Sequence, residues 1–366
     1  MQETEKIFST DLVRSEEPAF KTLSPFRAKL LRLLHACSPL FTRLVYFFFH
    51  TKIPGIKHLA KWIFFKKYLK GDLSYQELYR RSPTAAAMFI RREQRDFPKA
   101  LEKIGAPADA CFFAATPIDL KGQVVEAKGI QYTLKGLLAL DQIPAVFQNY
   151  WLTLVEKFYQ GVLLNFYLSP PDYHWFRMPL AGKLKKIIRL SGRLRTVDPA
   201  YQFAAESEFP VVATNERVIF EFEDPQGQSF LLLAVGAMGC SGICSELLDF
   251  RSCPRGFWDA VRLKEVENYG PEIWEAQEKG ILRRVSLGEG VGRANFKSGR
   301  CQAENQHQIL LKDNGLIFNK GEELGFFEIG STVLLLFPPS MEFCLRDNLK
   351  PYDKVRAGEF LGKIKL

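Results

Sequence analysis

The spacing of apolar residues along the chain predicts helices first and strands afterwards. Between Phe26 and Lys70 apolar residues recur at helical spacing, with a break at Pro54 and Gly55, which indicates two or three helices. A second amphipathic helical pattern runs from Leu73 to Lys103 and ends near Gly105. The first hundred residues are therefore predicted to be mainly helical.

Beyond residue 105 the pattern becomes typical of β-strands. Arg217–Glu223 alternates, with Val218, Phe220 and Phe222 on one face. Ser229–Val235 and Thr332–Phe337 are apolar runs, which predict strands that are buried on both faces. We expect Thr332–Phe337 to be a central strand, because it is too apolar to be exposed. The predicted fold class is α+β, with N-terminal helices followed by a β-rich core.

Residues 245–310 depart from this β pattern. Helical periodicity covers 257–268, and Pro271–Gln277 predicts a short helix with Pro at its first turn and Gly280 after its end. The sequence GEGVG at 288–292 is compatible with a phosphate-binding loop or with a flexible loop. No Lys-Ser/Thr pair directly follows its last glycine and no clear strand precedes it, which favours the flexible loop.

The charge of the chain is concentrated in one segment. The 366 residues are 47% apolar and 25% charged, which excludes a mostly disordered chain and allows one large domain or two ordinary ones. The net charge is +9, and residues 21–70 hold eleven Lys or Arg with no Asp or Glu. The longest stretch without a charged residue, 225–245, is interrupted by several glycines and polar residues, so a membrane-spanning helix is not predicted.

Aromatic rings accompany this basic segment. Ten of the 48 aromatic residues of the chain lie between Phe26 and Lys70. Apolar rings beside an all-positive charge set favour helices that lie in the interface of an anionic membrane. The alternative is a helix pair that packs on its own domain and has a solvated basic face. Nucleic-acid binding is disfavoured, because the basic residues alternate with bulky apolar ones rather than with polar side chains that read bases.

The cysteines do not predict a disulfide framework. There are seven, their spacing is irregular, and the first twenty residues lack the apolar core of a secretory signal. Free thiols in a reducing compartment are therefore expected. Cys240, Cys244 and Cys253 lack the usual two-residue spacer of a zinc site, and the nearest His in sequence is His307. We expect no metal site.

Three short segments carry candidate chemistry: PAD at 107–109, YLSPPDYHWFRMP at 167–179 and GEELGFFEIGSTV at 321–333. Each segment alone is weak evidence for a function, because Gly-Ser-Thr is a common turn and a lone His is more often structural than catalytic. Together and in this order they resemble the phosphatidylserine decarboxylase family, and the resemblance extends from about Phe89 to Ile364. Further blocks that fit the family are FIRR at 89–92, KGIQYTL at 128–134, NERV at 215–218, VGA at 235–237 and VRAGE at 355–359.

The resemblance implies a precursor that cleaves itself between Gly330 and Ser331. In the family a serine hydroxyl attacks the carbonyl of the preceding residue, the peptide becomes an ester, and elimination and hydrolysis turn the serine into a pyruvoyl group. Here the products would be a β chain, 1–330, and an associated α chain, 331–366. Glycine before serine suits this reaction, because it lets the hydroxyl approach and the backbone bend.

The resemblance also implies an Asp-His-Ser triad for self-cleavage, formed by Asp109, His174 and Ser331. Ala110 replaces the glycine of the family motif and is tolerated only where a positive φ is not required. Arg177 stands where the family usually has a second His, and arginine cannot act as a general base near neutral pH. Three interpretations remain open: His174 serves both self-cleavage and decarboxylation, Arg177 only stabilises charge, or self-cleavage is slow or absent.

The activity that the resemblance implies is the decarboxylation of phosphatidylserine to phosphatidylethanolamine. The pyruvoyl group would accept the electrons that carbon dioxide leaves behind, without pyridoxal phosphate or a metal. Residues 1–72 would then form a membrane-associating region and 73–366 the catalytic domain, with an atypical insertion near 245–310. Cys240-Ser241-Gly242 also departs from the family pattern.

These expectations place the protein on a membrane surface, as a peripheral protein at the cytoplasmic face of the cell membrane. Family members are often homodimers. One alternative is a decarboxylase of a free amino acid on the same scaffold, which would not need residues 26–70. The other is a degenerate homologue that binds lipid and stays uncleaved.

Overall fold

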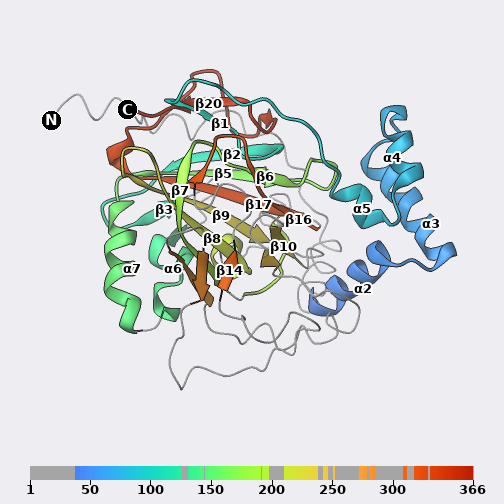
Figure 1. Cartoon of the computed structure of the whole chain (residues 1–366), viewed down its shortest axis with the longest axis horizontal. Coiled ribbons are helices and arrows are strands. Elements are labelled where there is room, and N and C mark those ends of the chain that lie inside the picture. The colour runs from blue at the N-terminus through green and yellow to red at the C-terminus, as the bar shows by residue number, and fades with distance from the viewer. Residues whose placement is uncertain are drawn as a thin grey trace.

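The chain forms a β-rich body with a group of helices at one side (Figure 1). The computed structural model describes most of residues 38–366. The residues that it does not describe are 1–37, 126–130, 144, 191, 198–209, 238–241, 246–249, 252–271, 278–280, 285–307, 311–316, 329 and 366. Within the described residues the fold is α+β, as the sequence predicts.

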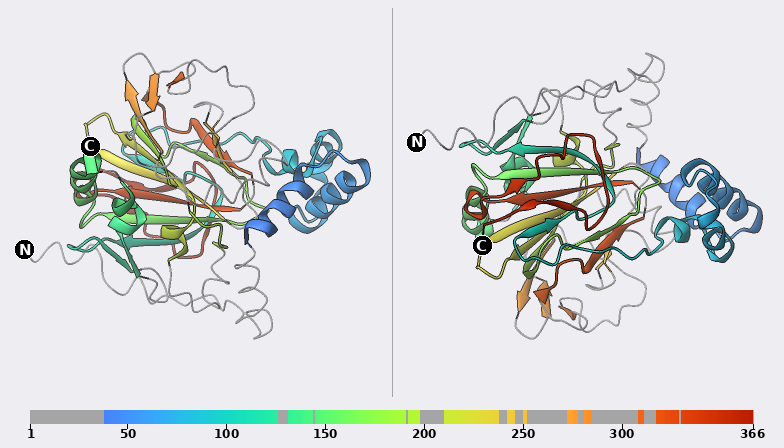
Figure 2. Two further views of the ribbon diagram at one scale, coloured as in Figure 1. Left: turned by 90° about the horizontal axis from the view of Figure 1, so that it is seen from below. Right: turned by 90° about the horizontal axis from the view of Figure 1, so that it is seen from above.

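Residues 38–89 form the group of helices, which we call the helical lobe (Figure 2). Its elements are α2 Ser38–His50, α3 Pro54–Ile63, the π-helix Phe64–Tyr68, the 3₁₀ turn Leu73–Tyr75, α4 Gln76–Arg81 and α5 Ala85–Phe89. Proline at the first turn of α3 suits a helix start, because that N–H has no partner within the helix. The lobe has its own apolar cluster, which joins Phe49, Phe64 and Phe89.

The predicted helix from Leu73 to Lys103 is wrong beyond residue 90, where the chain continues to residue 102 without a helix or strand. Polar groups of this stretch bond to the β-rich body instead. The carbonyl of Ile90 accepts a hydrogen bond from the Trp175 indole at 3.0 Å. The Arg95 guanidinium donates to Asp109 at 2.7 Å. Contacts distant in sequence therefore override the local helical periodicity.

The β-rich body is built on an eleven-stranded antiparallel sheet, in which β15 pairs with β7 beside the main order β14-β13-β12-β7-β8-β9-β17-β5-β2-β19. The strands are β2 Ala110–Pro117, β5 Val162–Leu168, β7 Gly182–Leu190, β8 Arg217–Glu223, β9 Ser229–Gly236, β12 Glu272–Gln277, β13 Ile281–Arg284, β14 Gln308–Leu310, β15 Ile317–Phe318, β17 Ser331–Phe337 and β19 Lys354–Val355. The predicted strands at 217, 229 and 332 are confirmed as β8, β9 and β17.

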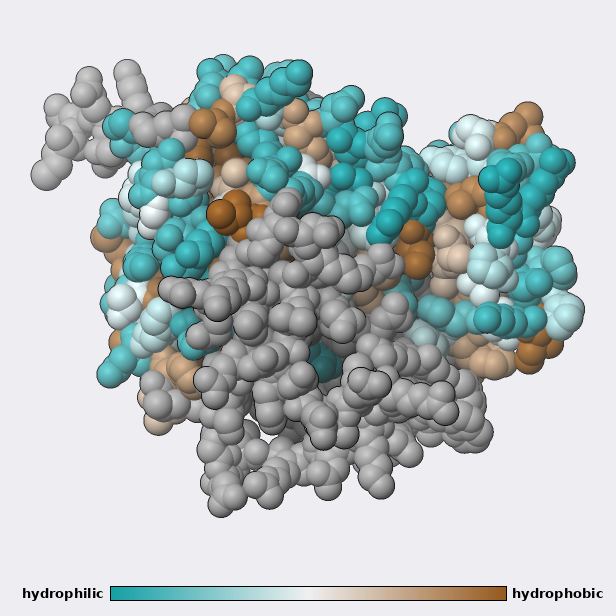
Figure 3. Space-filling view, viewed as in Figure 1, coloured by the Kyte–Doolittle hydropathy of each residue, from teal (hydrophilic) through white to brown (hydrophobic). Residues whose placement is uncertain are grey.

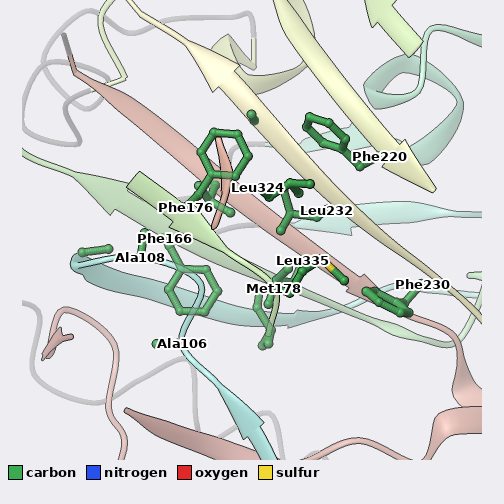
Figure 4. Packing of buried hydrophobic residues seen from close by; sticks show 14 of the residues in the cluster. Ala106, Ala108, Phe166, Phe176, Met178, Phe220, Phe230, Leu232, Leu324 and Leu335 are labelled. Carbon is green, nitrogen blue, oxygen red and sulfur yellow. The ribbon is translucent and has the colours of Figure 1, made fainter. Parts of the chain in front are cut away.

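Strand β17 lies between β9 and β5, and all seven of its residues are buried. Successive side chains of a strand point to opposite faces. Accordingly Val333 and Leu335 join one apolar core, part of which Figure 4 shows, whereas Leu334 and Leu336 join a second core under α7. The expectation that this segment is a central strand is confirmed.

Three smaller sheets and several helices complete the body. The four-stranded sheet has the order β11-β10-β16-β6, the three-stranded sheet β1-β20-β18, and β3 pairs with β4. Their strands are β1 Lys103–Gly105, β3 Gln123–Val125, β4 Gln131–Thr133, β6 Trp175–Arg177, β10 Ile243–Ser245, β11 Phe250–Arg251, β16 Glu323–Phe327, β18 Cys344–Leu345 and β20 Phe360–Lys363. The helices are α6 Leu134–Leu137, α7 Ala145–Lys157, α9 Val211–Thr214 and the 3₁₀ turns Leu140–Gln142 and Pro339–Met341.

The predicted helix at Pro271–Gln277 is wrong, because Glu272–Gln277 forms strand β12. It pairs with β7 on one side and β13 on the other. Ile273 and Trp274 enter the two different cores, as neighbouring residues of a strand must. The segments 257–268 and 288–292, Cys37, Cys240, Cys253, Cys301 and most of 245–310 lie outside the described residues.

Cys111, Cys244 and Cys344 are free thiols. Within the described part of the chain no three His, Cys, Asp or Glu side chains are grouped as a metal site requires. None of the helices described there has the length and apolar character needed to cross a bilayer.

Candidate active site

Two connecting segments that carry predicted site residues lie side by side. Residues 169–174 join β5 to β6, and residues 328–330 join β16 to β17. Strand β5 pairs with β17, and β6 pairs with β16. The ends of both segments therefore lie at the same junction between the eleven-stranded and the four-stranded sheet, although Ile329 itself is outside the described residues. We call the two segments the crossing segments. His174 ends the first, and Ser331 follows the second.

His174 is completely buried, and its ring is oriented by one hydrogen bond. Its Nδ1 lies 2.8 Å from the carbonyl oxygen of Asp172. A carbonyl can only accept, so Nδ1 carries the proton and Nε2 has the free lone pair of a neutral imidazole. Nε2 has no hydrogen-bond partner.

The surroundings of His174 keep its ring neutral. Burial lowers its pKa from 6.5 to about 3; the hydrogen bond to Asp172 opposes this shift, and the charges of Arg91 and Lys354 add to it. The Phe89 ring of the helical lobe packs against the imidazole, with ring centroids 4.0 Å apart. A neutral imidazole with a free Nε2 can accept a proton at neutral pH.

The Gly330–Ser331 bond joins a glycine of unusual backbone conformation to a buried serine. Gly330 has a φ of +47°, a conformation that side chains disfavour, and there is open space where a Cβ would stand. Ser331 is fully buried, and its hydroxyl has no hydrogen-bond partner among the residues that the structure describes. Its backbone is fixed at the start of β17, opposite Leu168 and Gly236. A buried hydroxyl that lacks a partner among the described residues thus follows a glycine in a left-handed backbone conformation.

Asp109 lies in the turn before β2, and its carboxylate is already engaged. The Arg95 guanidinium donates to its two oxygens at 3.1 and 2.7 Å, and the Ala357 N–H donates at 2.8 Å. No hydrogen bond joins Asp109 to His174, whose Nδ1 bonds to the Asp172 carbonyl instead. Asp109 is connected to the His174 segment indirectly, because Arg95 also lies over the Tyr173 ring at 4.8 Å.

Ala110, which follows Asp109 and replaces the family glycine, is buried and does not have a positive φ. The condition under which alanine is tolerated there is therefore met.

Arg177 is held in a polar network on β6. Its guanidinium donates to the Glu323 carboxylate at 2.7 Å, to the Tyr173 hydroxyl at 3.1 Å, and to the carbonyls of Glu93 and Gly321, each at 3.1 Å. Its side chain is only 12% exposed. These bonds tie β6 to β16 and to the chain that leaves the helical lobe. They favour a structural and charge-stabilising role for Arg177.

We expect Arg177→His to lower the stability of the protein and not to speed self-cleavage. The shorter ring cannot reach all the acceptors, and the half-buried Glu323 carboxylate loses the closer of its two arginine partners, at a cost of about 3 kcal/mol. Denaturant unfolding of uncleaved protein measures the first effect, and the rate of chain cleavage measures the second. Arg81→His is the control, because the Arg81 side chain is 82% exposed. Faster cleavage in Arg177→His would instead identify Arg177 as the position of a lost base.

Sequence reasoning missed the residues of the helical lobe that reach the crossing segments. Phe89 packs against His174, and His50 Nε2 at the end of α2 lies 3.4 Å from the carboxylate of Glu328. Glu328 is buried and precedes the cleavage bond by two residues. The FIRR block gave a signal for Phe89, whereas no sequence signal identified His50.

Comparison with known proteins identifies the family of this chain. The phosphatidylserine decarboxylase family matches residues 84–363, which include both crossing segments. A phosphatidylserine decarboxylase proenzyme from Glaesserella parasuis is 30% identical over 316 residues, covering 85% of this chain and 86% of the relative. Proenzymes of the same description from Hahella chejuensis and Halorhodospira halophila are each 28% identical, over 86% and 95% of this chain and 86% and 97% of theirs. The chain belongs to the phosphatidylserine decarboxylase family.

Proposed function

We propose that this protein converts phosphatidylserine to phosphatidylethanolamine after cleaving its own chain between Gly330 and Ser331. The observation that carries the proposal is the buried Ser331 hydroxyl, which has no partner and follows a glycine at positive φ. The neutral imidazole of His174 ends the neighbouring crossing segment. The names of the relatives add support for the substrate and for a precursor form.

Self-cleavage would use groups of this chain alone. The Ser331 hydroxyl adds to the Gly330 carbonyl while His174 Nε2 takes its proton, and the C–N bond breaks to give an ester and a free amine. Loss of the α proton of residue 331 then expels the Gly330 carboxylate and ends the larger chain. Water hydrolyses the resulting enamine, releases ammonia and leaves a ketone, the pyruvoyl group, at position 331.

The residues around Ser331 fit a pyruvoyl group, because the position is buried in a central strand and needs no side-chain partner. The group supplies an electron sink for the loss of carbon dioxide from an amino acid. In that reaction His174 would hold the proton that replaces the carboxylate. Asp109 would act as a positioning residue through Arg95 and Tyr173. Arg177 would hold β6 in place.

Intact-mass analysis of the purified protein tests the proposal. We expect two chains, residues 1–330 and 331–366, with the smaller chain blocked at its N-terminus by a ketone. Decarboxylation is then measured on phosphatidylserine in mixed micelles and on free amino acids. A full-length chain with an ordinary serine at 331 would leave the proposed catalyst without its electrophile, and turnover of free amino acids alone would replace the lipid substrate.

We also propose that the helical lobe binds the membrane surface that holds the lipid substrate. Leu59 and Trp62 on α3 are each 51% exposed (Figure 3 shows apolar side chains over the lobe). Lys66 and Lys67 follow on the π-helix, and residues 38–71 contain no Asp or Glu. Exposed apolar residues among lysines suit an anionic bilayer. Lys61 is an exception, because it is buried and donates to a carbonyl at 2.8 Å.

We expect the double change Leu59→Glu with Trp62→Glu to weaken binding to phosphatidylserine vesicles more than tenfold, because it removes two apolar side chains from the bilayer contact and adds two charges that anionic lipid repels. Vesicle co-sedimentation of the full chain measures this effect. Leu120→Glu is the matched control, since Leu120 is 72% exposed on the β-rich body. Equal binding by all three proteins would exclude α3 from the membrane contact.

A further inference from the structure

Arg91 is a buried arginine with an unused donor. It stands directly beyond the helical lobe, and its side chain is 6% exposed. Nε donates to Glu93 at 2.8 Å, Nη2 donates to the Pro171 carbonyl at 3.0 Å, and the guanidinium lies over the Tyr75 ring at 5.2 Å. Nη1 is buried, and no group in the described part of the chain forms a hydrogen bond with it. A guanidinium stays charged in proteins, so an unmet donor on it is costly unless an acceptor arrives.

Three consecutive contacts place Arg91 beside the crossing segment that carries His174. Phe89 packs against the His174 ring, and the Ile90 carbonyl accepts from the Trp175 indole at 3.0 Å. Arg91 itself bonds to Pro171 on the same segment. Its positive charge is close enough to help lower the pKa of His174.

The charges around Arg91 do not balance. Arginines and carboxylates form a connected network in which Glu93 is shared between Arg91 and Arg95, and Arg95 also binds Asp109. Glu323 pairs with Arg177 and, at 3.6 Å, with Arg92. Four arginines thus meet three carboxylates, and the excess positive charge lies beside the proposed catalytic His. This surplus is complementary to an anionic headgroup.

We propose that Arg91 is the anion subsite that receives the phosphate of the phospholipid headgroup through Nη1. The inference rests on the proposed function and names the part of the site that holds its substrate. Guanidinium N–H groups match the oxygens of phosphate and of carboxylate. A bond to the carboxylate would stabilise the group that must leave as carbon dioxide, and would thus oppose the reaction. A bond to the phosphate, which persists from substrate to product, holds the headgroup without that penalty.

Arg91→Lys tests this assignment. Lysine keeps the charge and can donate to the Pro171 carbonyl, but it lacks the second Nη group. We expect KM for phosphatidylserine in mixed micelles to rise about tenfold or more, while kcat and the rate of self-cleavage change less than threefold. Arg81→Lys is the matched control, because the Arg81 side chain is 82% exposed. A parallel loss of self-cleavage and turnover would show that Arg91 is only structural, and would overturn the proposal.

The product analogue glycerophosphoethanolamine separates the two anions of the substrate, because it has the phosphate and lacks the carboxylate. If Arg91 binds phosphate, the inhibition constant of this compound rises in Arg91→Lys by the same factor as KM for phosphatidylserine. An unchanged inhibition constant together with a raised KM would mean that Arg91 binds the carboxylate of the substrate, and would overturn the phosphate assignment.

Unmodified enzyme provides a check that does not depend on the variant folding. Glycerophosphoethanolamine should inhibit it at least tenfold more strongly than ethanolamine does. Equal inhibition would mean that no phosphate subsite exists. Cleavage and turnover of the unmodified protein are measured first. If it shows neither, the proposed function itself is refuted. If it is active and Arg91→Lys has the same KM, only the phosphate subsite is refuted.

Discussion

Replacing Ser331 by alanine is expected to leave one uncleaved chain of 41.9 kDa that does not decarboxylate phosphatidylserine. Alanine has no hydroxyl to attack the Gly330 carbonyl, so neither the chain break nor the ketone can form. The loss is complete rather than partial, because no other residue can become the N-terminal carbonyl group of the smaller chain. Intact mass and release of carbon dioxide from carboxyl-labelled lipid measure the two effects.

Ser340→Ala is the matched control for this change. Ser340 is an exposed serine of the same C-terminal segment, and its hydroxyl bonds to Gln228 at 2.6 Å. We expect this variant to cleave and to turn over substrate like the unmodified protein. Release of carbon dioxide by uncleaved Ser331→Ala protein would show that the reaction does not need a group derived from Ser331.

The central strands could be predicted because a strand that is buried on both faces is apolar at nearly every position. Thr332–Phe337 is apolar throughout, and it becomes β17 between two strands. Strand β12 could not be predicted in the same way. Its apolar residues fit a short helix as well as a strand, and only pairing with β7, about ninety residues earlier in the chain, decides between them.

The sequence motifs could predict which side chains belong to the site, but not the groups that those side chains contact. The motifs identified His174 and the Gly330–Ser331 bond, and pairing of β5 with β17 and of β6 with β16 brings their segments together. The partner of His174 Nδ1 is a backbone carbonyl, which carries no residue identity and leaves no trace in sequence. The partner of Asp109 is Arg95, whose position depends on the irregular chain after Ile90.

The contacts of the helical lobe suggest why membrane binding and catalysis would belong to one chain. Phe89 covers the His174 ring and helps to exclude water from it. His50 reaches the carboxylate of Glu328, close before the Gly330–Ser331 bond. If the lobe binds the bilayer as proposed, the surface that meets the lipid belongs to the same helical lobe that packs against the His174 imidazole. Lipid would then arrive at the side of the body where the crossing segments lie.

His174→Gln is expected to slow self-cleavage by about a hundredfold to ten-thousandfold. Glutamine fills similar space and can donate to the Asp172 carbonyl, but it offers no basic nitrogen where Nε2 stands. His58→Gln is the control, since His58 is an exposed histidine of α3. Cleavage at the unmodified rate in His174→Gln would remove His174 from the mechanism and leave Ser331 without an identified base.

The pH dependence of the stability of uncleaved Ser331→Ala protein provides a second test of the role of His174. The pKa of His174 is about 3 in the folded state and 6.5 ordinarily, so between these values the unfolded chain binds a proton that the folded chain does not. The free energy of unfolding should therefore fall as pH decreases through this window, by up to about 1.4 kcal/mol per pH unit. Adding His174→Gln should remove this contribution, whereas His58→Gln should keep it. The same slope in all three proteins would mean that the imidazole is not held neutral by burial, and would contradict its assignment as a base with a free Nε2.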